Sequence, residues 1–157
     1  TERLLLRPAW PEDWEMILWA IGDERVVCNL ARAPWPYRAE DAREFAGRGQ
    51  DMRSPAFLLT LPDRDGARLI GCAGLDAGRD RVELGYWIAR PYWGRGFATE
   101  AGRAMLEVAR LLGHRRIEAG HYTDNPASGR VLRKLGFQPT GAVRPRDCRA
   151  RGETVPC

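Results

Sequence analysis

The sequence predicts one α+β domain, with helices and strands mixed along a single chain. Two observations predict this class. Some segments carry apolar residues at helical spacing, and others are short apolar runs typical of strands. Glycine or proline separates most of these segments, and no repeat or low-complexity linker divides the 157 residues. We therefore expect residues 1–157 to form a single domain.

The first part of the chain is expected to contain two strands and three helical segments. In order, they are a strand over Glu2–Arg7, a helix from Pro11 to Ile21, a helical turn over Val26–Leu30, a helix from Glu40 to about Asp51 and a strand over Ala56–Leu61. Pro11 and Gly22 mark the ends of the first helix, since proline suits a first turn and glycine an exit. The two prolines of Ala33–Tyr37 predict a loop.

Strands dominate the middle of the chain and alternate with helices after it. Turns at Asp63–Gly66 and Asp76–Asp80 are expected to join successive strands. The later elements are strands over Ala67–Leu75 and Val82–Ala89, a helix over Gly96–Leu112, a strand over Arg116–Tyr122, a helix from Asn125 to Leu135 and a strand starting at Phe137–Thr140. A last strand should begin near Glu153, close to where the sequence stops. Because the sequence also begins with Thr rather than Met, we expect it to be incomplete at its ends.

The helix over Gly96–Leu112 is the clearest, because apolar residues form one stripe along it. The stripe consists of Phe97, Ala101, Ala104, Met105, Val108 and Leu112. Thr99 and Glu100 are expected on the polar side. Asn125 and Pro126 have the residue types of an N-cap and a first helical position for the next helix.

Composition excludes several classes of protein. Apolar residues make up 44% and charged residues 29% of the chain, as in soluble globular proteins. No run approaches the roughly 20 apolar residues that a membrane span needs, and no basic-then-apolar leader is present. The cysteines form no CxxC pair, and the two histidines complete no metal-ligand spacing. We therefore expect a cytoplasmic protein with free thiols, without a metal and without a membrane partner.

The net charge of +4 comes almost entirely from arginine, since Lys134 is the one lysine. One interpretation is a surface that binds nucleic acid, and a simpler one is a genome biased toward arginine codons. The arginines are scattered among Asp and Glu, so we expect no direct nucleic-acid partner. Some of them could instead contact the phosphates of a nucleotide-like cofactor.

The segment Gly85–Ala101, GYWIARPYWGRGFATEA, carries the strongest chemical signal. A strand leads into a glycine-rich turn, and the turn begins the long helix. The start of a helix exposes backbone N–H groups without intrahelical partners, and the helix dipole adds positive potential there. Gly94 and Gly96 let a phosphate approach the backbone closely. The segment therefore predicts an anion site.

The identity of the anion stays open at this level. Thr99 occupies the third glycine position of GxGxxG, and no lysine follows as in a P-loop, so dinucleotide and nucleoside-triphosphate sites lose their main support. The alternative is a strand–turn–helix unit whose glycines only permit tight packing.

Two blocks resemble the GNAT superfamily of N-acetyltransferases. Gly96 and Ala98 match the last two positions of its phosphate-loop pattern, Gln/Arg-x-x-Gly-x-Gly/Ala, although Trp93 replaces the usual Gln or Arg. The stretch YWGRGFATEA is similar to the branch that contains the ribosomal-protein N-terminal acetyltransferases. The block NPASGRVLRKLGF, from Asn125 to Phe137, resembles the N-x-x-S-x-R-V-L-x-K-x-G-F segment of that branch. ERLLLRPAWPEDW resembles its first strand and helix, so the resemblance covers nearly the whole chain.

The resemblance implies a GNAT fold: a mixed, mostly antiparallel sheet, flanked by about four helices, whose fourth and fifth strands are parallel and splay apart. Acetyl-CoA would lie in the gap, with its pantetheine arm paired to the strand edge and its pyrophosphate on the glycine turn. Asn125 would face it from the exit of the fifth strand. The residues implied for acetyl-CoA are Trp87, Ile88, Ala89, Trp93, Gly94, Arg95, Gly96, Phe97, Ala98, Thr99, Asn125, Ser128, Arg130 and Lys134.

The implied reaction is direct attack of an amine on the thioester, which needs a proton acceptor for the amine. Glu83 is the leading candidate, because histone-type members of the superfamily carry a glutamate on the fourth strand. It could also be an ordinary exposed strand residue. Weaker candidates are Asp76, His121 and Asp124.

The leaving thiolate needs a proton or hydrogen-bond donor. Many family members use a Tyr of the last helix, but the aligned position here is Leu132. Ser128, one turn earlier, matches the serine of the ribosomal-type branch. It could donate a hydrogen bond to the thiolate, or it could help to cap its helix. Tyr122 is an outside candidate.

Four further residues have two interpretations each. Arg130 and Lys134 lie at i and i+4 and could reach the nucleotide phosphates, or form a solvated basic face. Trp35 and Tyr37 precede a helix that borders the acceptor site in this family, and could shape the amine pocket or anchor their loop.

The expected function is acetyl-CoA-dependent acetylation of an amine, either a protein N-terminus or a small molecule. A catalytically silent CoA-binding module and an arginine-rich nucleic-acid or ribosome-surface binder are the alternatives. An α-amine, with a pKa of about 7.7–8.0, would need less help from a base than a lysine-like amine with a pKa of about 10.4. The resemblance also suggests a homodimer.

Overall fold

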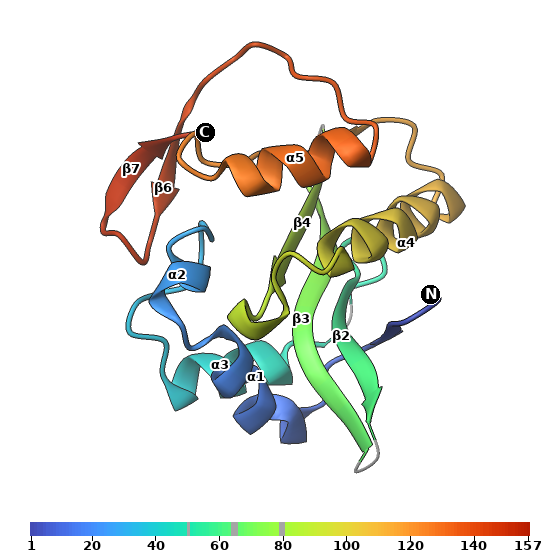
Figure 1. The fold of residues 1–157 in the computed structure, drawn as a ribbon, viewed down its shortest axis with the longest axis vertical. Helices are drawn as coiled ribbons and strands as arrows, with labels where there is room; N and C mark the ends of the chain where they lie inside the picture. Colours follow the sequence, from blue (N-terminus) through green and yellow to red (C-terminus); the bar gives the residue numbers. More distant parts are fainter. Residues whose placement is uncertain (50, 64–65, 79–80) are drawn as a thin grey trace.

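A twisted sheet runs through the middle of the molecule, and helices cover both of its faces (Figure 1). The computed structural model describes residues 1–49, 51–63, 66–78 and 81–157. Over this part of the chain the sheet has five strands. In spatial order, they are β1 (Leu5–Arg7), β2 (Ala56–Asp63), β3 (Gly66–Ala77), β4 (Val82–Ile88) and β5 (Ile117–Glu118).

The sheet is mixed, as the sequence predicts. The pairs β1–β2, β2–β3 and β3–β4 are antiparallel, and β4–β5 is parallel. The parallel pair is short: Val82 lies opposite Ile117 and Glu83 opposite Glu118, and there the ladder ends. Among the described residues, β4 continues to Ile88 with β3 on one side and no strand on the other. The predicted splay of the fourth and fifth strands is therefore confirmed.

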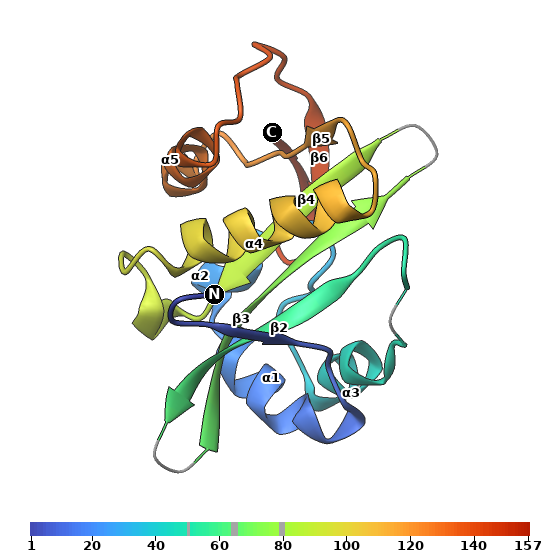
Figure 2. The same cartoon turned by 90° about the vertical axis from the view of Figure 1, so that its right-hand side faces the viewer.

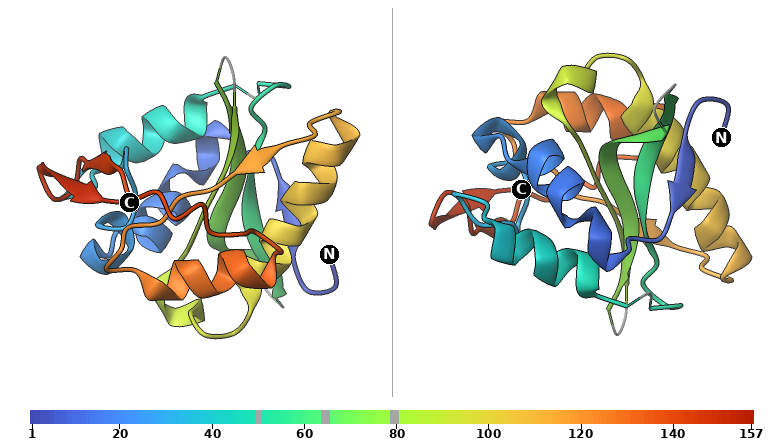
Figure 3. Two further views of the ribbon diagram at one scale, coloured as in Figure 1. Left: turned by 90° about the horizontal axis from the view of Figure 1, so that it is seen from above. Right: turned by 90° about the horizontal axis from the view of Figure 1, so that it is seen from below.

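The helices are divided between the two faces of the sheet. They are η1 (Pro11–Asp13), α1 (Trp14–Ile21), α2 (Glu24–Val27), α3 (Ala39–Gly47), η2 (Arg90–Tyr92), α4 (Phe97–Leu111) and α5 (Pro126–Lys134), where η marks a 3₁₀ turn. α1 and α3 pack together on one face, and α4 crosses the other face over β3 and β4 (Figures 2 and 3). α5 packs beside α4, where Leu135 closely approaches Gly102.

The core lies on both faces of β3, because the helices shield the sheet on each side. Ile17 of α1, Ile70 of β3 and Met105 of α4 have no solvent exposure. The apolar stripe predicted for α4 is largely confirmed, with Phe97, Ala101 and Met105 buried. Two details differ: Thr99 is buried instead of facing solvent, and Leu112 is 38% exposed.

The later strands differ from the prediction. The expected strand Arg116–Tyr122 is hydrogen-bonded only at Ile117–Glu118. Beyond it the chain leaves β4, and the Thr123 N–H donates to the Pro156 carbonyl instead. No strand starts at Phe137–Thr140. Pro139 lacks an N–H, and Gly141 adopts a left-handed backbone conformation with φ of +74°, so an extended ladder is interrupted there.

A separate hairpin, β6 (Pro145–Cys148) with β7 (Glu153–Pro156), follows that irregular stretch. Its second strand confirms the prediction of a strand near Glu153. The Arg149 N–H donates to the Ala31 carbonyl (3.1 Å), which ties the hairpin to the segment after α2.

The remaining boundaries are close to those predicted. β1 and α2 are shorter than expected, and α3 ends at Gly47 rather than near Asp51. The expected turns at Asp63–Gly66 and Asp76–Asp80 lie partly outside the described residues, at 64–65 and 79–80. Asp76 itself belongs to β3.

Gly71 lets β3 and β4 approach each other at the end that leads into the glycine turn. A Cβ at this position would lie 2.3 Å from the Trp87 carbonyl oxygen, and backbone cannot move aside cheaply. The neighbouring Ile70 carbonyl accepts the Ala89 N–H (2.8 Å) and so fixes the end of β4. A side chain at position 71 would therefore disturb both strands.

We expect Gly71→Ala to lower the free energy of unfolding by about 2 kcal/mol, because overpacking a filled core typically costs that much. Gly47→Ala is the matched control, since a Cβ there meets nothing within 4 Å. Thermal and urea unfolding of both variants would measure the difference. Equal midpoints would mean that β3 and β4 can separate at Gly71 without cost.

Candidate active site

A cavity of about 500 Å³ opens where β4 and β5 part. One wall is the free edge of β4, and the glycine turn and the start of α4 form one end. α5 and residues 120–125 form the opposite wall. At the other end, the segment around Val26 and Asn29–Ala31 and the β6–β7 hairpin close the cavity. The splay and the cavity thus coincide.

The glycine turn has the geometry of an anion site. Gly94 and Gly96 adopt φ values of +73° and +82°, which residues with a Cβ rarely adopt. Gly96 is the N-cap of α4 and provides no side-chain cap. The first N–H groups of α4 therefore have no partner within the described residues, and the cavity is lined by Gly94, Gly96, Phe97, Ala98 and Thr99.

Arg95 is the member of this turn that does not line the cavity. Its guanidinium lies 5.7 Å from the ring centre of Tyr92 and 5.4 Å from that of Phe97. Its side chain is thus placed against the aromatic rings of the turn rather than in the cavity.

Some backbone groups near the end of β4 are hydrogen-bonded within the protein, and other residues of this edge line the cavity. Trp87 and Ile88 line the cavity, whereas the Ala89 N–H is already used by Ile70 of β3. The Trp93 indole N–H donates to the Ile88 carbonyl at 2.6 Å. Trp93, the residue that departs from the family pattern, therefore satisfies the Ile88 carbonyl at the strand edge.

Ser128 contacts Tyr86, a residue that the sequence analysis did not identify as part of the site. Its hydroxyl lies 2.8 Å from the hydroxyl of Tyr86 on β4, and both residues line the cavity. Burial raises the pKa of Tyr86 more than its hydrogen bond with Ser128 lowers it. Tyr86 therefore keeps its proton at neutral pH and is available as a donor.

Asn125 caps α5, as predicted. Its side-chain oxygen accepts the Ser128 N–H at 3.2 Å. The capping function belongs to Asn125, which leaves the Ser128 hydroxyl to its contact with Tyr86. Leu132, at the position where many family members carry a tyrosine, is buried.

Glu83 lines the cavity next to the point where β5 departs, but its carboxylate is engaged. Both of its oxygens accept hydrogen bonds from the Arg146 guanidinium of β6, one of them at 3.0 Å. This pair raises the pKa of Arg146 above its ordinary value, mainly through the hydrogen bond that Arg146 donates to Glu83. The predicted proton acceptor is therefore held by an arginine.

The other candidate proton acceptors have distinct environments. Asp124 lines the cavity, but both of its oxygens accept from Arg151, at 2.6 and 3.2 Å, and that hydrogen bonding lowers the pKa of Asp124. Asp76 pairs with Arg32 outside the cavity lining. His121 lines the cavity, and its Nδ1 lies 2.9 Å from the Tyr122 carbonyl.

The remaining predicted residues divide into two groups. Arg130 and Lys134 of α5 both line the cavity. Trp35 and Tyr37 are not among the residues that line it. The Tyr37 hydroxyl donates to the Asp41 carbonyl (3.3 Å), and burial raises its pKa to about 12, so Tyr37 anchors its loop to α3.

Comparison with known proteins identifies the family. Residues 3–138 match the model described as an acetyltransferase (GNAT) domain, so the chain belongs to the GNAT acetyltransferase family. It is 33% identical to the uncharacterized N-acetyltransferase YoaA of Bacillus subtilis (strain 168), over 92% of this chain and 84% of that protein. It is 27% identical to the ribosomal protein uS5-alanine N-acetyltransferase of Escherichia coli (strain K12), over 92% and 79% respectively.

The fold also matches a solved enzyme. Spermidine N-acetyltransferase from Vibrio cholerae, crystallised with CoA and spermine, superposes with a TM-score of 0.76 at 20% identity, over 99% of this chain and 94% of that chain. The resemblance inferred from the glycine turn and the Asn125–Phe137 block is thereby confirmed, and with it the assignment as an N-acetyltransferase.

Three further features concern the part of the chain that the structure describes. In the part of the chain that the structure describes, no helix is long and apolar enough to cross a membrane. No cluster of three or more His, Cys, Asp or Glu side chains in those residues could hold a metal ion. All four cysteines, Cys28, Cys72, Cys148 and Cys157, are free thiols, as predicted.

Proposed function

We propose that this chain transfers the acetyl group of acetyl-CoA directly to an amine of low pKa, such as the α-amine of a peptide or an amino acid. The observation that carries the proposal is the glycine turn, which exposes unpartnered N–H groups to a cavity between two splayed strands. The kind of amine is inferred from Glu83 and Asp124, the two carboxylates that line the cavity away from the glycine turn.

The residues present fit acetyl-CoA. The N–H groups between Gly94 and Thr99 would hold the pyrophosphate, and each hydrogen bond to a charged oxygen contributes roughly 1.5–3 kcal/mol. Arg130 and Lys134 would approach the nucleotide phosphates from α5, and the edge at Trp87 and Ile88 would run along the pantetheine arm. The Vibrio cholerae enzyme, which was crystallised with CoA, supports this assignment by its similar fold.

Acetyl-CoA binding can be tested with two glutamate variants that share the same backbone strain. We expect Gly96→Glu to weaken binding by about 100-fold or more, since a negative charge beside the turn would repel the pyrophosphate and compete with Glu100 for Arg3. Gly113→Glu is the matched control, because Gly113 has nearly the same φ (+83° against +82°) but ends α4 instead of starting it. Calorimetric titration would measure both. Absence of binding by the unmodified protein would refute the proposed function.

The geometry of Ser128 favours a role at the leaving group. The amine nitrogen forms its bond to the acetyl carbon, the carbon–sulfur bond breaks, and negative charge develops on sulfur. If Tyr86 donates its proton to Ser128 Oγ (2.8 Å) rather than to the Ser128 carbonyl (3.3 Å), the Ser128 hydroxyl proton is free to point toward that sulfur. A thiol pKa of about 8.5 makes the thiolate a fair leaving group, so a hydrogen bond suffices.

We expect Ser128→Ala to lower kcat by about 10- to 100-fold while the KM for acetyl-CoA changes little, because the lost bond acts on charge that develops in the transition state. Tyr86→Phe should lower kcat by a smaller factor. Ser54→Ala, which removes a hydroxyl bonded to the Ala77 N–H away from the cavity, is the control. An unchanged kcat in Ser128→Ala would exclude this role.

The end of the cavity that holds Glu83 and Asp124 suits an amine that loses its proton readily. Its two carboxylates, Glu83 and Asp124, each accept hydrogen bonds at both oxygens from an arginine, so an incoming amine would compete with a guanidinium for them. Neither is well placed to take a proton from an amine of pKa about 10.4. The same pairing leaves little negative charge to attract a polyamine.

We expect a peptide with a free α-amine to be acetylated faster than a lysine ε-amine, with kcat/KM rising with pH along the titration of the amine itself. Glu83→Gln, which keeps one acceptor oxygen for Arg146, should lower kcat/KM by only a few-fold and leave that pH profile in place. Glu83 as general base would instead cost about 10²–10⁴-fold. Thiol release from acetyl-CoA measures each rate.

A further inference from the structure

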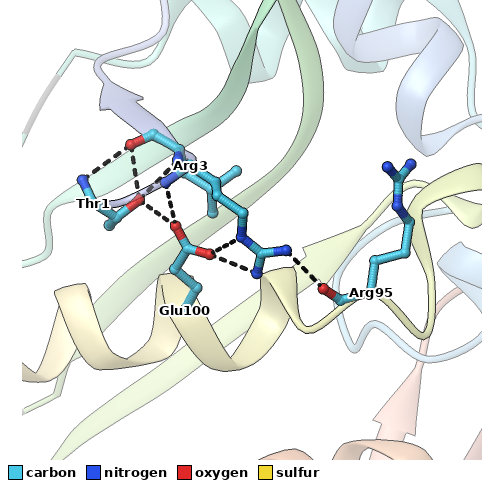
Figure 4. A network of polar contacts seen from close by, with 5 residues as sticks. Thr1, Arg3, Arg95 and Glu100 are labelled. Atoms are coloured by element: carbon cyan, nitrogen blue, oxygen red, sulfur yellow. Dashed lines mark hydrogen bonds and ion pairs between the residues drawn. The ribbon is translucent and has the colours of Figure 1, made fainter.

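The first residues of the chain pack against the outer side of the glycine turn (Figure 4). Glu100, in the first turn of α4, accepts hydrogen bonds from the Thr1 hydroxyl (2.6 Å) and the Arg3 N–H (2.8 Å) at one oxygen. Its other oxygen accepts from Arg3 Nε at 2.7 Å, and Arg3 Nη2 lies at the same distance. Arg3 thus engages Glu100 with two guanidinium nitrogens.

The same guanidinium reaches the turn itself. Arg3 Nη1 donates to the Arg95 carbonyl at 3.0 Å, and the guanidinium carbon lies 4.4 Å from the ring centre of Phe97. A Cβ built on Gly96 would lie 3.5 Å from Arg3 Nη2. One side chain therefore contacts the turn on both sides of Gly96 and is anchored by Glu100.

The bond to the Arg95 carbonyl determines where the next N–H points. The peptide bond between Arg95 and Gly96 is trans, so its C=O and N–H point in opposite directions. With the carbonyl held on the outside by Arg3, the Gly96 N–H faces the opposite side, toward the cavity that Gly96 lines. This N–H has no acceptor within the described residues.

The turn does not lock this orientation by itself. Gly96 can adopt φ of either sign at similar cost, so the Arg95–Gly96 peptide can rotate and turn its carbonyl toward the cavity. A carbonyl there would repel a phosphate that the N–H would otherwise bind. An external contact is needed to keep one orientation, and Arg3 is in contact with the carbonyl in question.

Resting on the proposed function, we propose that Arg3 is a positioning residue for acetyl-CoA: it holds the Arg95–Gly96 peptide so that the Gly96 N–H faces the pyrophosphate. Glu100 is its anchor. Burial tends to raise the pKa of Glu100, but the hydrogen bonds from Thr1 and Arg3 outweigh it and lower that pKa. The anchor is therefore charged at neutral pH.

The first measurement compares three arginine variants by titration with acetyl-CoA. Arg3→Ala should raise Kd about tenfold, the loss expected for one hydrogen bond to a charged group. Arg3→Lys keeps the charge but cannot bond Glu100 and the Arg95 carbonyl in the same fork, so it should be nearly as defective. Arg90→Ala, which removes an exposed arginine from a 2.7 Å ion pair with Asp23 near the same turn, is the control and should bind normally.

Glu100→Gln separates positioning from simple charge. Removing a negative charge beside the phosphate site would tighten acetyl-CoA binding if electrostatics alone mattered. Loss of the anchor should instead weaken it, so a raised Kd supports the proposal and a lowered Kd contradicts it. Melting temperatures close to that of the unmodified protein are expected, because partly exposed ion pairs add little to stability.

S-acetylpantetheine, which lacks the pyrophosphate, provides the second readout. The defect of Arg3→Ala should appear in kcat/KM with acetyl-CoA and vanish with S-acetylpantetheine, whereas a general loss of structure would reduce both. Full rescue by Arg3→Lys, or an equal defect with both donors, would overturn the inference. If the unmodified protein does not bind acetyl-CoA, the proposed function fails instead, so the two failures are distinguishable.

Discussion

β4 and β5 are hydrogen-bonded only at two residue pairs, and from Leu84 to Ile88 one edge of β4 has no strand partner in the part of the chain that the structure describes. Backbone polar groups need partners, so an unpaired edge inside a protein must be satisfied by other groups. Here the Trp93 indole takes the Ile88 carbonyl, and the cavity runs along the rest of the edge. Because the glycine turn follows β4 directly, the same divergence places the exposed N–H groups of α4 at one end of that cavity.

The other end of the cavity is closed by elements that come late in the chain. The β6–β7 hairpin contributes Arg146 to Glu83, and the turn between its strands contributes Arg151 to Asp124. Arg151 also donates to the Cys28 carbonyl after α2 (2.8 Å), which joins the hairpin to that segment. Arg146 and Arg151 thus act as bidentate connectors, a role that the planar guanidinium suits better than an ammonium group.

The features of the site that could be predicted from the sequence are those that depend on residues close together in the chain. The turn at Gly94–Gly96, the start of α4 and the cap at Asn125 are local features, because backbone dihedrals, helix ends and capping bonds involve residues a few positions apart. The prediction of a strand from Phe137 was wrong for an equally local reason. Phe137 suggested an apolar strand start, but Pro139 and the left-handed Gly141 interrupt an extended ladder there. The assignment of Trp35 and Tyr37 to the acceptor pocket rested on position alone, and neither residue lines the cavity.

By itself, the sequence determined the family, the order of most elements and the backbone groups of the phosphate turn. Only the tertiary structure decided which side chains act together: Tyr86 with Ser128, 42 positions apart, Glu83 with Arg146, 63 apart, and Arg3 with Glu100, 97 apart. No spacing rule reports such pairs, since they form when separate elements pack against one another. Each pairing changes what the residue can do, because hydrogen bonding and burial, rather than residue type alone, decide whether a carboxylate accepts a proton or a hydroxyl donates one.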